Sequence, residues 1–329
     1  MELRPYQKES FDAVLKQWDD GILKTLLVLP TGCGKTIVFA KITEECVRRG
    51  DRVLILAHRG ELLEQAADKL KKATGLMSAV EKADQSCIGS WYRVVVGSVQ
   101  TLMRTKRLAG FSSDYFDTII IDEAHHATAD TYQKVLAYFK PSFTLGLTAT
   151  PERTDDNKVI LDIFKNTAHK LDIQTAVEIG ELVPIRCIRI HTNIDLTKVR
   201  FNSIQYSIRD LESKIYVPER NRLIVDTWLQ YVRNKRTVVF CASVRHAEQI
   251  AELFREAGIH AASVSGSMKQ SERKEFQDRF VDREIQMLCA CDLLNEGWDC
   301  PEIEVLFMAR PTMSKVLYTQ QLGRGIASL

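Results

Sequence analysis

The sequence has no cysteine pair spaced as C-x-x-C, although eight of its 329 residues are cysteines. Structural zinc sites usually take their ligands from such pairs, and the group Cys289, Cys291 and Cys300 has no second pair to complete a site. The sequence therefore predicts no zinc. Most of the cysteines lie in apolar runs, where a free thiol behaves as a small hydrophobe, and this usage is typical of the reducing cytosol. We accordingly expect a cytoplasmic protein.

A signal peptide, a membrane span and an excess of charge of one sign are also missing. The first residues, MELRPYQKES, contain no apolar core. No apolar run reaches the roughly 20 residues that span a bilayer, so no membrane partner is predicted. Lys and Arg number 45 against 43 Asp and Glu, which gives a formal net charge of +2. Without a global basic field, nucleic-acid binding would require a local basic surface or backbone contacts.

The sequence does contain a regular alternation of short apolar runs and amphipathic segments. The runs are continuous blocks of β-branched residues and Leu, which favours strands buried on both faces of a parallel sheet. Strands are predicted over 25–29, 52–56, 93–97, 118–122 and 143–148, and in the second half over 236–241, 260–265, 286–290 and 305–309. Helices are predicted over 36–49, 61–72, 244–257 and 271–280. This pattern predicts a doubly wound α/β domain in each half.

The stretch PTGCGKT, Pro30 to Thr36, follows a predicted strand and precedes a predicted helix. The usual phosphate-loop pattern, G-x-x-x-x-G-K-[ST], has Leu29 in place of its first glycine. The preceding strand, the two glycines, the Lys-Thr pair and the following helix are nevertheless all typical of a nucleotide-binding site. Lys35 would reach the β- and γ-phosphates, and the Thr36 hydroxyl would ligate Mg²⁺. The alternative is a tight strand-to-helix turn with a surface lysine.

Two carboxylates end the apolar run IIIDEAHH, residues 119–126. Burying them unpaired would be costly, so this strand end is expected to open on a polar site. Asp122 suits a role with Mg²⁺, and Glu123 suits activation of an attacking water. A lone Asp-Glu is more often a helix N-cap, but after a phosphate loop in the same domain that alternative is the weaker one.

PTGCGKT, DEAH (122–125) and TATPER (148–153) together resemble the superfamily 2 DEAD/DEAH-type helicases, and most closely the branch of restriction-enzyme motor subunits and DNA-repair helicases. The resemblance covers nearly the whole chain, with the motifs in family order, and this family drops the first glycine of the loop. It implies two tandem RecA-like domains, each a mostly parallel sheet flanked by helices, with a nucleotide cleft between them. The expected ATP-binding domain spans 1–185, a connector 186–220 and the helicase C-terminal domain 221–329.

The resemblance also implies a role for individual residues. ATP and Mg²⁺ are the implied cofactors. Lys35, Glu123 and Arg324 are the expected catalytic residues, with Arg324 as the arginine finger. The expected nucleotide-binding residues are Gln7 (on adenine), Pro30, Thr31, Gly32, Cys33, Gly34, Lys35, Thr36, Gly297 and Asp299, and those for the metal are Thr36 and Asp122. Nucleic-acid contacts are expected from His58, Arg59, Ser98, Gln100, Thr101, Ser243 and Arg273, each with a loop cap as its alternative. Thr148, Thr150, His125 and Gln320 are expected to couple hydrolysis to movement.

Three positions depart from the family pattern. Cys291 replaces a threonine that touches the nucleic-acid backbone in many relatives, and a thiol is a poorer hydrogen-bond partner. Trp298 would stack on a base or, as the favoured alternative, lie buried. Ala327 stands where the last motif usually has a second arginine, and the sequence stops at Leu329. We therefore expect a truncated end, and weak hydrolysis of ATP if Arg324 cannot replace the missing arginine.

The leading hypothesis is an ATP-dependent helicase or translocase acting on nucleic acid, with DNA favoured over RNA. Its competitor is a weakly hydrolysing or non-hydrolysing motor fragment, which binds DNA under the control of nucleotide within a larger restriction, repair or defence complex. A recombination-type or transport ATPase sharing only the phosphate loop ranks last, because it leaves the motifs of the second half unexplained.

Overall fold

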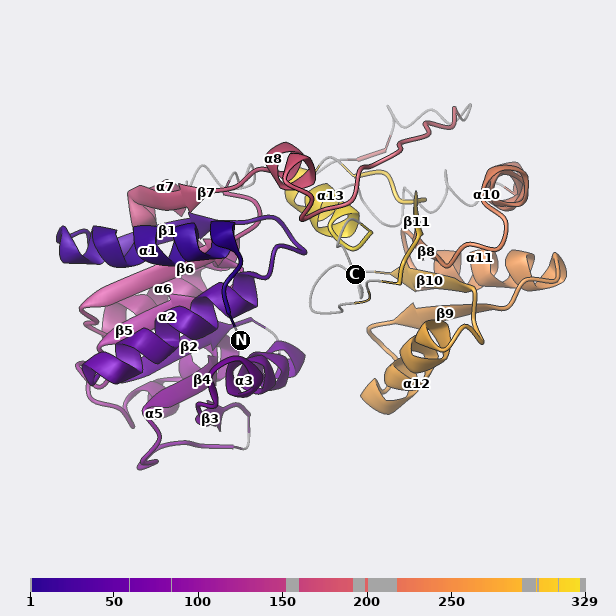
Figure 1. Cartoon of the computed structure of the whole chain (residues 1–329). Helices are drawn as coiled ribbons and strands as arrows, with labels where there is room; N and C mark the ends of the chain where they lie inside the picture. The colour runs from indigo at the N-terminus through magenta and orange to yellow at the C-terminus, as the bar shows by residue number, and fades with distance from the viewer. Residues whose placement is uncertain are drawn as a thin grey trace. The chain divides into compact units, whose positions relative to one another are not determined.

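A computed structural model describes residues 2–58, 60–83, 85–151, 160–191, 199–200, 218–291, 300, 302–312 and 314–325 (Figure 1). The chain divides into two compact units, Met1–Glu181 (unit 1) and Leu182–Leu329 (unit 2). Of the predicted connector, 186–220, residues 192–198 and 201–217 lie outside the described part. Among the described residues, no helix is long and apolar enough to cross a membrane.

Unit 1 contains a parallel sheet of seven strands in the order β3-β4-β2-β5-β6-β1-β7. The strands are β1 (Lys24–Val28), β2 (Val53–Ala57), β3 (Ser78–Glu81), β4 (Val94–Ser98), β5 (Thr118–Ile121), β6 (Phe143–Thr148) and β7 (Asn166–Lys170). All five strands predicted for this half form, each within one residue of its expected bounds. The strands β3 and β7 were not predicted. They are the two sheet edges, and their partly exposed residues form no continuous apolar run.

Helices flank this sheet (Figure 1). They are α1 (Pro5–Asp19), α2 (Lys35–Arg49), α3 (Gly60–Thr74), α4 (Val99–Leu102), α5 (Thr105–Leu108), η1 (Ala124–His126), α6 (Asp130–Tyr138), α7 (Ile160–Phe164) and α8 (Ile173–Glu178). Successive strand residues point to opposite faces. Leu26 and Leu54 pack with Phe164 in the main core cluster. Their neighbours Leu27 and Ile55 are also fully buried. Both faces of the sheet are therefore covered, as the continuous apolar runs predicted.

Unit 2 contains a parallel sheet of four strands in the order β11-β8-β10-β9. Its strands are β8 (Thr237–Phe240), β9 (Ala261–Ser265), β10 (Met287–Cys291) and β11 (Val305–Met308), and its helices are α10 (Pro218–Tyr231), α11 (Val244–Glu256), α12 (Gln270–Val281) and α13 (Lys315–Leu322). Val239 lies in a core cluster with Trp228 of α10 and Phe254 of α11. Its neighbour Val238 lies in a second cluster with Phe280 of α12. The predicted doubly wound α/β arrangement is confirmed in each unit.

Candidate nucleotide and nucleic-acid site

The loop between β1 and α2 contains two glycines in the left-handed region of backbone conformation. Gly32 and Gly34 have positive φ angles of 91° and 64°, which glycine adopts without strain. A Cβ added at Gly34 would lie 2.5 Å from the Nε2 atom of Gln7. Leu29, by contrast, continues the sheet, because its N–H donates to the Thr148 carbonyl at 3.1 Å. The fold therefore requires glycines at positions 32 and 34 and none at position 29.

The first amides of α2 are available to an anion. The helix begins at Lys35, and its first backbone bonds are made by the N–H groups of Ile37 and Val38, which both donate to the Gly34 carbonyl. Within the described part of the chain, the N–H groups of Gly34, Lys35 and Thr36 donate to no protein group. Unpaired amides at a helix N-terminus, together with the positive end of the helix dipole, favour a bound phosphate.

Apart from Lys35, the remaining residues of this loop carry no charge. Pro30 and Cys33 are buried, Thr31 is half-buried and Gly32 is exposed. Burial raises the pKa of the Cys33 thiol to about 11, so this residue adds no negative charge beside a phosphate. Lys35 is half-buried, and its Nζ donates to the Leu29 carbonyl at 3.3 Å. The lysine side chain therefore folds back onto the loop whose bound phosphate it would contact.

Asp122 follows β5, and its N–H donates to the Leu56 carbonyl at 3.1 Å, which extends the sheet by one residue. Its Oδ1 accepts a hydrogen bond from the Glu123 N–H at 3.0 Å. Burial first, and then the charge of Glu123, raise the pKa of Asp122 to about 6, while the nearby charge of Lys35 lowers it. A carboxylate held in this environment without a full counter-charge is suited to a metal cation, which would take the place of the proton.

The residues of the phosphate loop and Asp122 fit Mg²⁺ that is bound together with a nucleoside triphosphate. They fit a metal ion bound by the protein alone less well. Among the described residues, no group of three or more His, Cys, Asp and Glu could hold a metal ion. Mg²⁺ needs no such cage, because it usually binds to one or two protein ligands and completes its octahedron with water and substrate phosphates. Thr36 and Asp122 can supply those ligands. The strand order β5-β6-β1 places the ends of β1 and β5 on either side of β6.

Glu123 has a backbone conformation that is uncommon for a residue with a side chain, with φ 49° and ψ 55°. Backbone strain of this kind clusters at active sites. Oε2 of Glu123 lies 3.3 Å from Nδ1 of His125. The same Nδ1 lies 3.3 Å from the Thr148 hydroxyl, at the end of the neighbouring strand β6. The structure thus links two of the predicted coupling residues, His125 and Thr148, to the general-base candidate.

The Thr148 hydroxyl continues this network into the next loop. It donates to the Thr150 carbonyl and accepts from the Thr150 N–H, each at 3.1 Å. His125, Thr148 and Thr150 are all buried. Hydrogen bonds within a buried network of this kind restrain the side chains that they join.

Gln7 lies against the phosphate loop from α1. Its Nε2 donates to the Cys33 carbonyl at 3.4 Å, and its Oε1 accepts from the Arg4 N–H at 3.0 Å. Tyr6, which was not singled out from the sequence, donates from its hydroxyl to the same Cys33 carbonyl at 2.9 Å. The only sequence signal for Tyr6 is its place beside Gln7 in the motif LRPYQKES. Both side chains are buried and brace the loop.

The residues expected to contact nucleic acid in unit 1 differ in accessibility. The His58 ring stacks on the His126 ring with centroids 4.8 Å apart. Ser98 and Thr101 are buried, and the Thr101 hydroxyl accepts a hydrogen bond from the Ala83 N–H at 2.9 Å. Gln100 is exposed. Gln100 is therefore better placed than Thr101 to reach a phosphate. Arg59 lies outside the described residues.

In unit 2, the Ser243 hydroxyl caps α11 by accepting from the His246 N–H at 3.2 Å. Arg273 is half-buried on α12, Gln320 is buried on α13, and Arg324 is half-buried just after that helix. Gly297 and Asp299 lie outside the described residues, as do Trp298 and Ala327. Cys291 is buried at the end of β10.

Asp122→Asn is expected to stabilise the nucleotide-free chain at neutral pH. The pKa of Asp122 lies above its ordinary value of 3.8, so the folded state holds this proton more tightly than the unfolded state. The free energy of unfolding therefore falls as pH rises from about 4 to about 6, and the loss persists above that range. Removing the charge should recover about 1–3 kcal/mol at pH 7.5, and less at pH 5. Thermal unfolding of the variant and the wild type without Mg²⁺, at the two pH values, measures this difference in stability. Equal or lower stability of the variant at both would show that Asp122 is not held in an unfavourable charged state.

Two protein families match the chain. Residues 1–153 match the model of the type III restriction enzyme res subunit, and residues 219–326 match that of the helicase conserved C-terminal domain. The Saccharomyces cerevisiae protein "Putative ATP-dependent helicase IRC3" is 31% identical over 98% of this chain and 49% of its own length. The type I restriction enzyme EcoAI endonuclease subunit of Escherichia coli is 24% identical over 98% of this chain and 44% of its own length. The chain thus spans about half the length of these relatives.

A solved structure shows the same fold. The ATP-dependent type ISP restriction-modification enzyme LlaBIII bound to DNA superposes with a TM-score of 0.75 at 18% sequence identity. The match covers 100% of this chain and 27% of that protein.

Proposed function

Because the chain belongs to the superfamily 2 helicases, we propose that it is an ATP-dependent helicase or translocase that acts on DNA. One observation carries the proposal. The phosphate loop with Lys35 and the carboxylate pair Asp122 and Glu123 end two strands of one parallel sheet, close enough for the Lys35 charge to lower the pKa of Asp122. Ligands of open α/β sheets bind at the carboxyl ends of the strands, where these residues lie.

In the proposed reaction, the amides of residues 34–36 and the Lys35 ammonium bind the phosphates of ATP. Thr36 and Asp122 would hold Mg²⁺, which neutralises charge on the phosphates when it is bound. Glu123 accepts the proton of the attacking water, because its carboxylate lies beside the site and beside His125. The network from His125 through Thr148 to Thr150 would carry the change at Glu123 to the loop after β6.

Four further residues enter the proposal on the family resemblance alone. Arg324 would stabilise the charge that develops on the transferred phosphate, and Gln320 would help to couple hydrolysis to movement. Gly297 and Asp299 would lie near the nucleotide. Hydrolysis and release of product then change the affinity for a bound strand, which is how a motor converts ATP into displacement.

The proposed substrate is DNA. Two of the proteins compared above are restriction enzymes, and the solved structure was obtained bound to DNA. With a net charge of only +2, binding must come from local contacts with phosphates, for which Gln100, Arg273 and Ser243 are our candidates. Membership of a larger restriction, repair or defence complex is part of the proposal. A cytoplasmic location is also part of the proposal. It is in keeping with the eight free thiols, of which all but Cys187 are buried.

Strand affinity that depends on nucleotide tests this function. Fluorescence anisotropy would follow the binding of labelled single-stranded DNA, and of RNA of the same sequence, to the full chain with Mg²⁺ and either a non-hydrolysable ATP analogue or ADP. We expect the two nucleotides to change the affinity by at least about fivefold, and DNA to bind more tightly than RNA. Identical affinities with both nucleotides would contradict a motor, and tighter binding of RNA would contradict the choice of DNA.

A further inference from the structure

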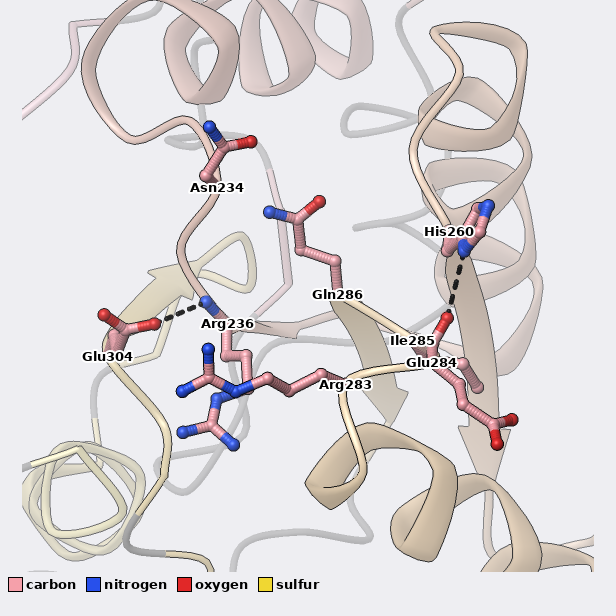
Figure 2. Close-up of a pocket in the computed structure, with 8 residues that line it drawn as sticks. All are labelled: Asn234, Arg236, His260, Arg283, Glu284, Ile285, Gln286 and Glu304. Atoms are coloured by element: carbon pink, nitrogen blue, oxygen red, sulfur yellow. Dashed lines mark hydrogen bonds between the residues drawn. The ribbon is translucent and has the colours of Figure 1, made fainter.

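Unit 2 has a cavity of about 250 Å³ at the amino ends of its strands (Figure 2). Arg236, His260, Gln286 and Glu304, which line it, each stand immediately before β8, β9, β10 and β11 respectively. Among the described candidates of unit 2, Ser243 follows β8 in the sequence, and Gln320 and Arg324 follow β11. None of these three residues lines this amino-edge pocket.

Two arginines, Arg236 and Arg283, line the amino-edge pocket (Figure 2). Arg236 donates from Nη1 to the Val281 carbonyl at 3.3 Å, but its buried Nε has no hydrogen-bond partner among the residues that the structure describes. Arg283 makes no ion pair or side-chain hydrogen bond with any residue in the described ranges. Its φ of 66° places it in an uncommon left-handed turn beside the pocket.

The two carboxylates of the amino-edge pocket are already engaged elsewhere. Glu304 pairs with Lys235 at 2.7 Å and accepts from the backbone N–H of Arg236 at 3.0 Å. Glu284 pairs with Arg279 at 3.0 Å, and in Figure 2 its carboxylate points away from the two guanidinium groups. Within the described residues, neither acid forms an ion pair with the side chain of Arg236 or Arg283.

Both guanidinium charges would attract an anion that enters this pocket. Guanidinium groups present planar pairs of N–H donors that match the oxygens of a phosphate, and such charge-assisted bonds are among the strongest. The amides of Asn234 and Gln286 add uncharged donors at the same pocket. Its volume is below the roughly 300–1,000 Å³ of pockets that enclose a drug-sized molecule, so it suits one phosphate with part of its sugar.

We propose that the amino-edge pocket binds a phosphate group of a nucleic-acid strand, through Arg236 and Arg283. The choice of a strand over a free nucleotide or inorganic phosphate rests on the proposed function. The pocket would give unit 2 a second contact with the nucleic acid, away from the strand ends that carry the motor motifs. Because it touches only backbone phosphate, this contact would be independent of sequence.

The pocket itself is tested with inorganic phosphate. The Nε–Hε signal of Arg236 in an NMR spectrum of the full chain, identified by its loss in Arg236→Lys, should shift during a phosphate titration at constant ionic strength. The shift should be reduced in Arg283→Gln, and thermal unfolding would verify that this exposed substitution leaves the fold intact. An unchanged Arg236 signal in the wild type would overturn the phosphate site.

The source of the phosphate is tested with a labelled single-stranded oligonucleotide. Arg283→Gln should weaken its binding about fivefold to tenfold, because one charge-assisted contact is lost. It should also lower the slope of log affinity against log salt by about 0.7. The matched control is Arg222→Gln, an exposed arginine on α10 outside the pocket, which should change neither quantity.

The outcomes separate the two proposals. If phosphate shifts the Arg236 signal but Arg283→Gln binds the oligonucleotide as the wild type does, the strand is the wrong ligand. If phosphate shifts the signal and the wild type binds no oligonucleotide, the proposed function fails, and with it the strand as ligand, while the phosphate site stands.

Discussion

Lys35→Ala should lower kcat for ATP hydrolysis by about 100-fold or more. The lysine is the only cation that we place on the phosphates from the loop itself, and the amides at the start of α2 cannot replace its full charge. Its hydrogen bond to the Leu29 carbonyl is worth about 1 kcal/mol, so the fold should persist. Steady-state turnover with Mg²⁺, supported by a thermal unfolding curve, measures both effects.

Lys41→Ala is the matched control for this variant. Lys41 lies on the same helix, α2, and pairs with Glu44 at 2.8 Å. Losing this partly exposed pair should leave kcat and KM unchanged. Turnover of Lys35→Ala within a few-fold of the wild type, with Lys41→Ala unchanged, would remove Lys35 from the phosphate site.

Glu123→Gln should separate binding of ATP from its hydrolysis. The amide keeps the size of the side chain but cannot accept a proton, so kcat should fall by about 100-fold to 10,000-fold. Thr36, Asp122 and Lys35 remain, so the affinity for ATP should change little. Equilibrium binding of a fluorescent ATP analogue with Mg²⁺ and single-turnover hydrolysis measure the two quantities separately.

A suitable control is Glu178→Gln on α8, an exposed acid whose contact is with Gln174 at 2.9 Å. It should leave both affinity and kcat as they are in the wild type. If Glu123→Gln loses its activity only because it no longer binds ATP, Glu123 holds the nucleotide or metal and is not the general base.

The fold could be predicted from the sequence wherever burial leaves a continuous apolar run. The strands β1, β2, β4, β5 and β6 were predicted in this way and are confirmed. The edge strands β3 and β7 were not predicted, because each borders only one other strand and contains partly exposed residues. The family resemblance is confirmed by the two matching family models, and the predicted fold class by the two parallel sheets and the structural relative.

The candidate site could be predicted only where a motif marks it. PTGCGKT and DEAH identified Lys35, Asp122 and Glu123, and their roles stay predictions. The support of the loop by Tyr6 could not be foreseen, because hydroxyl and loop meet only when α1 packs beside β1. The engagement of Thr101 with Ala83 depends on the path of the chain after β3. The amino-edge pocket has no motif at all, since Arg236 and Arg283 are distant in sequence and line one pocket only once β8 and β10 pair.

The most direct measurement for the central claim is steady-state turnover of ATP by the full chain with Mg²⁺, in the presence and absence of single-stranded and duplex DNA. A motor whose nucleotide site responds to its strand should hydrolyse ATP faster when DNA is bound, and Lys35→Ala should abolish both basal and stimulated turnover. Turnover at the level of Lys35→Ala under every condition would contradict the account, and would leave a nucleotide-gated DNA-binding module as the function of this chain.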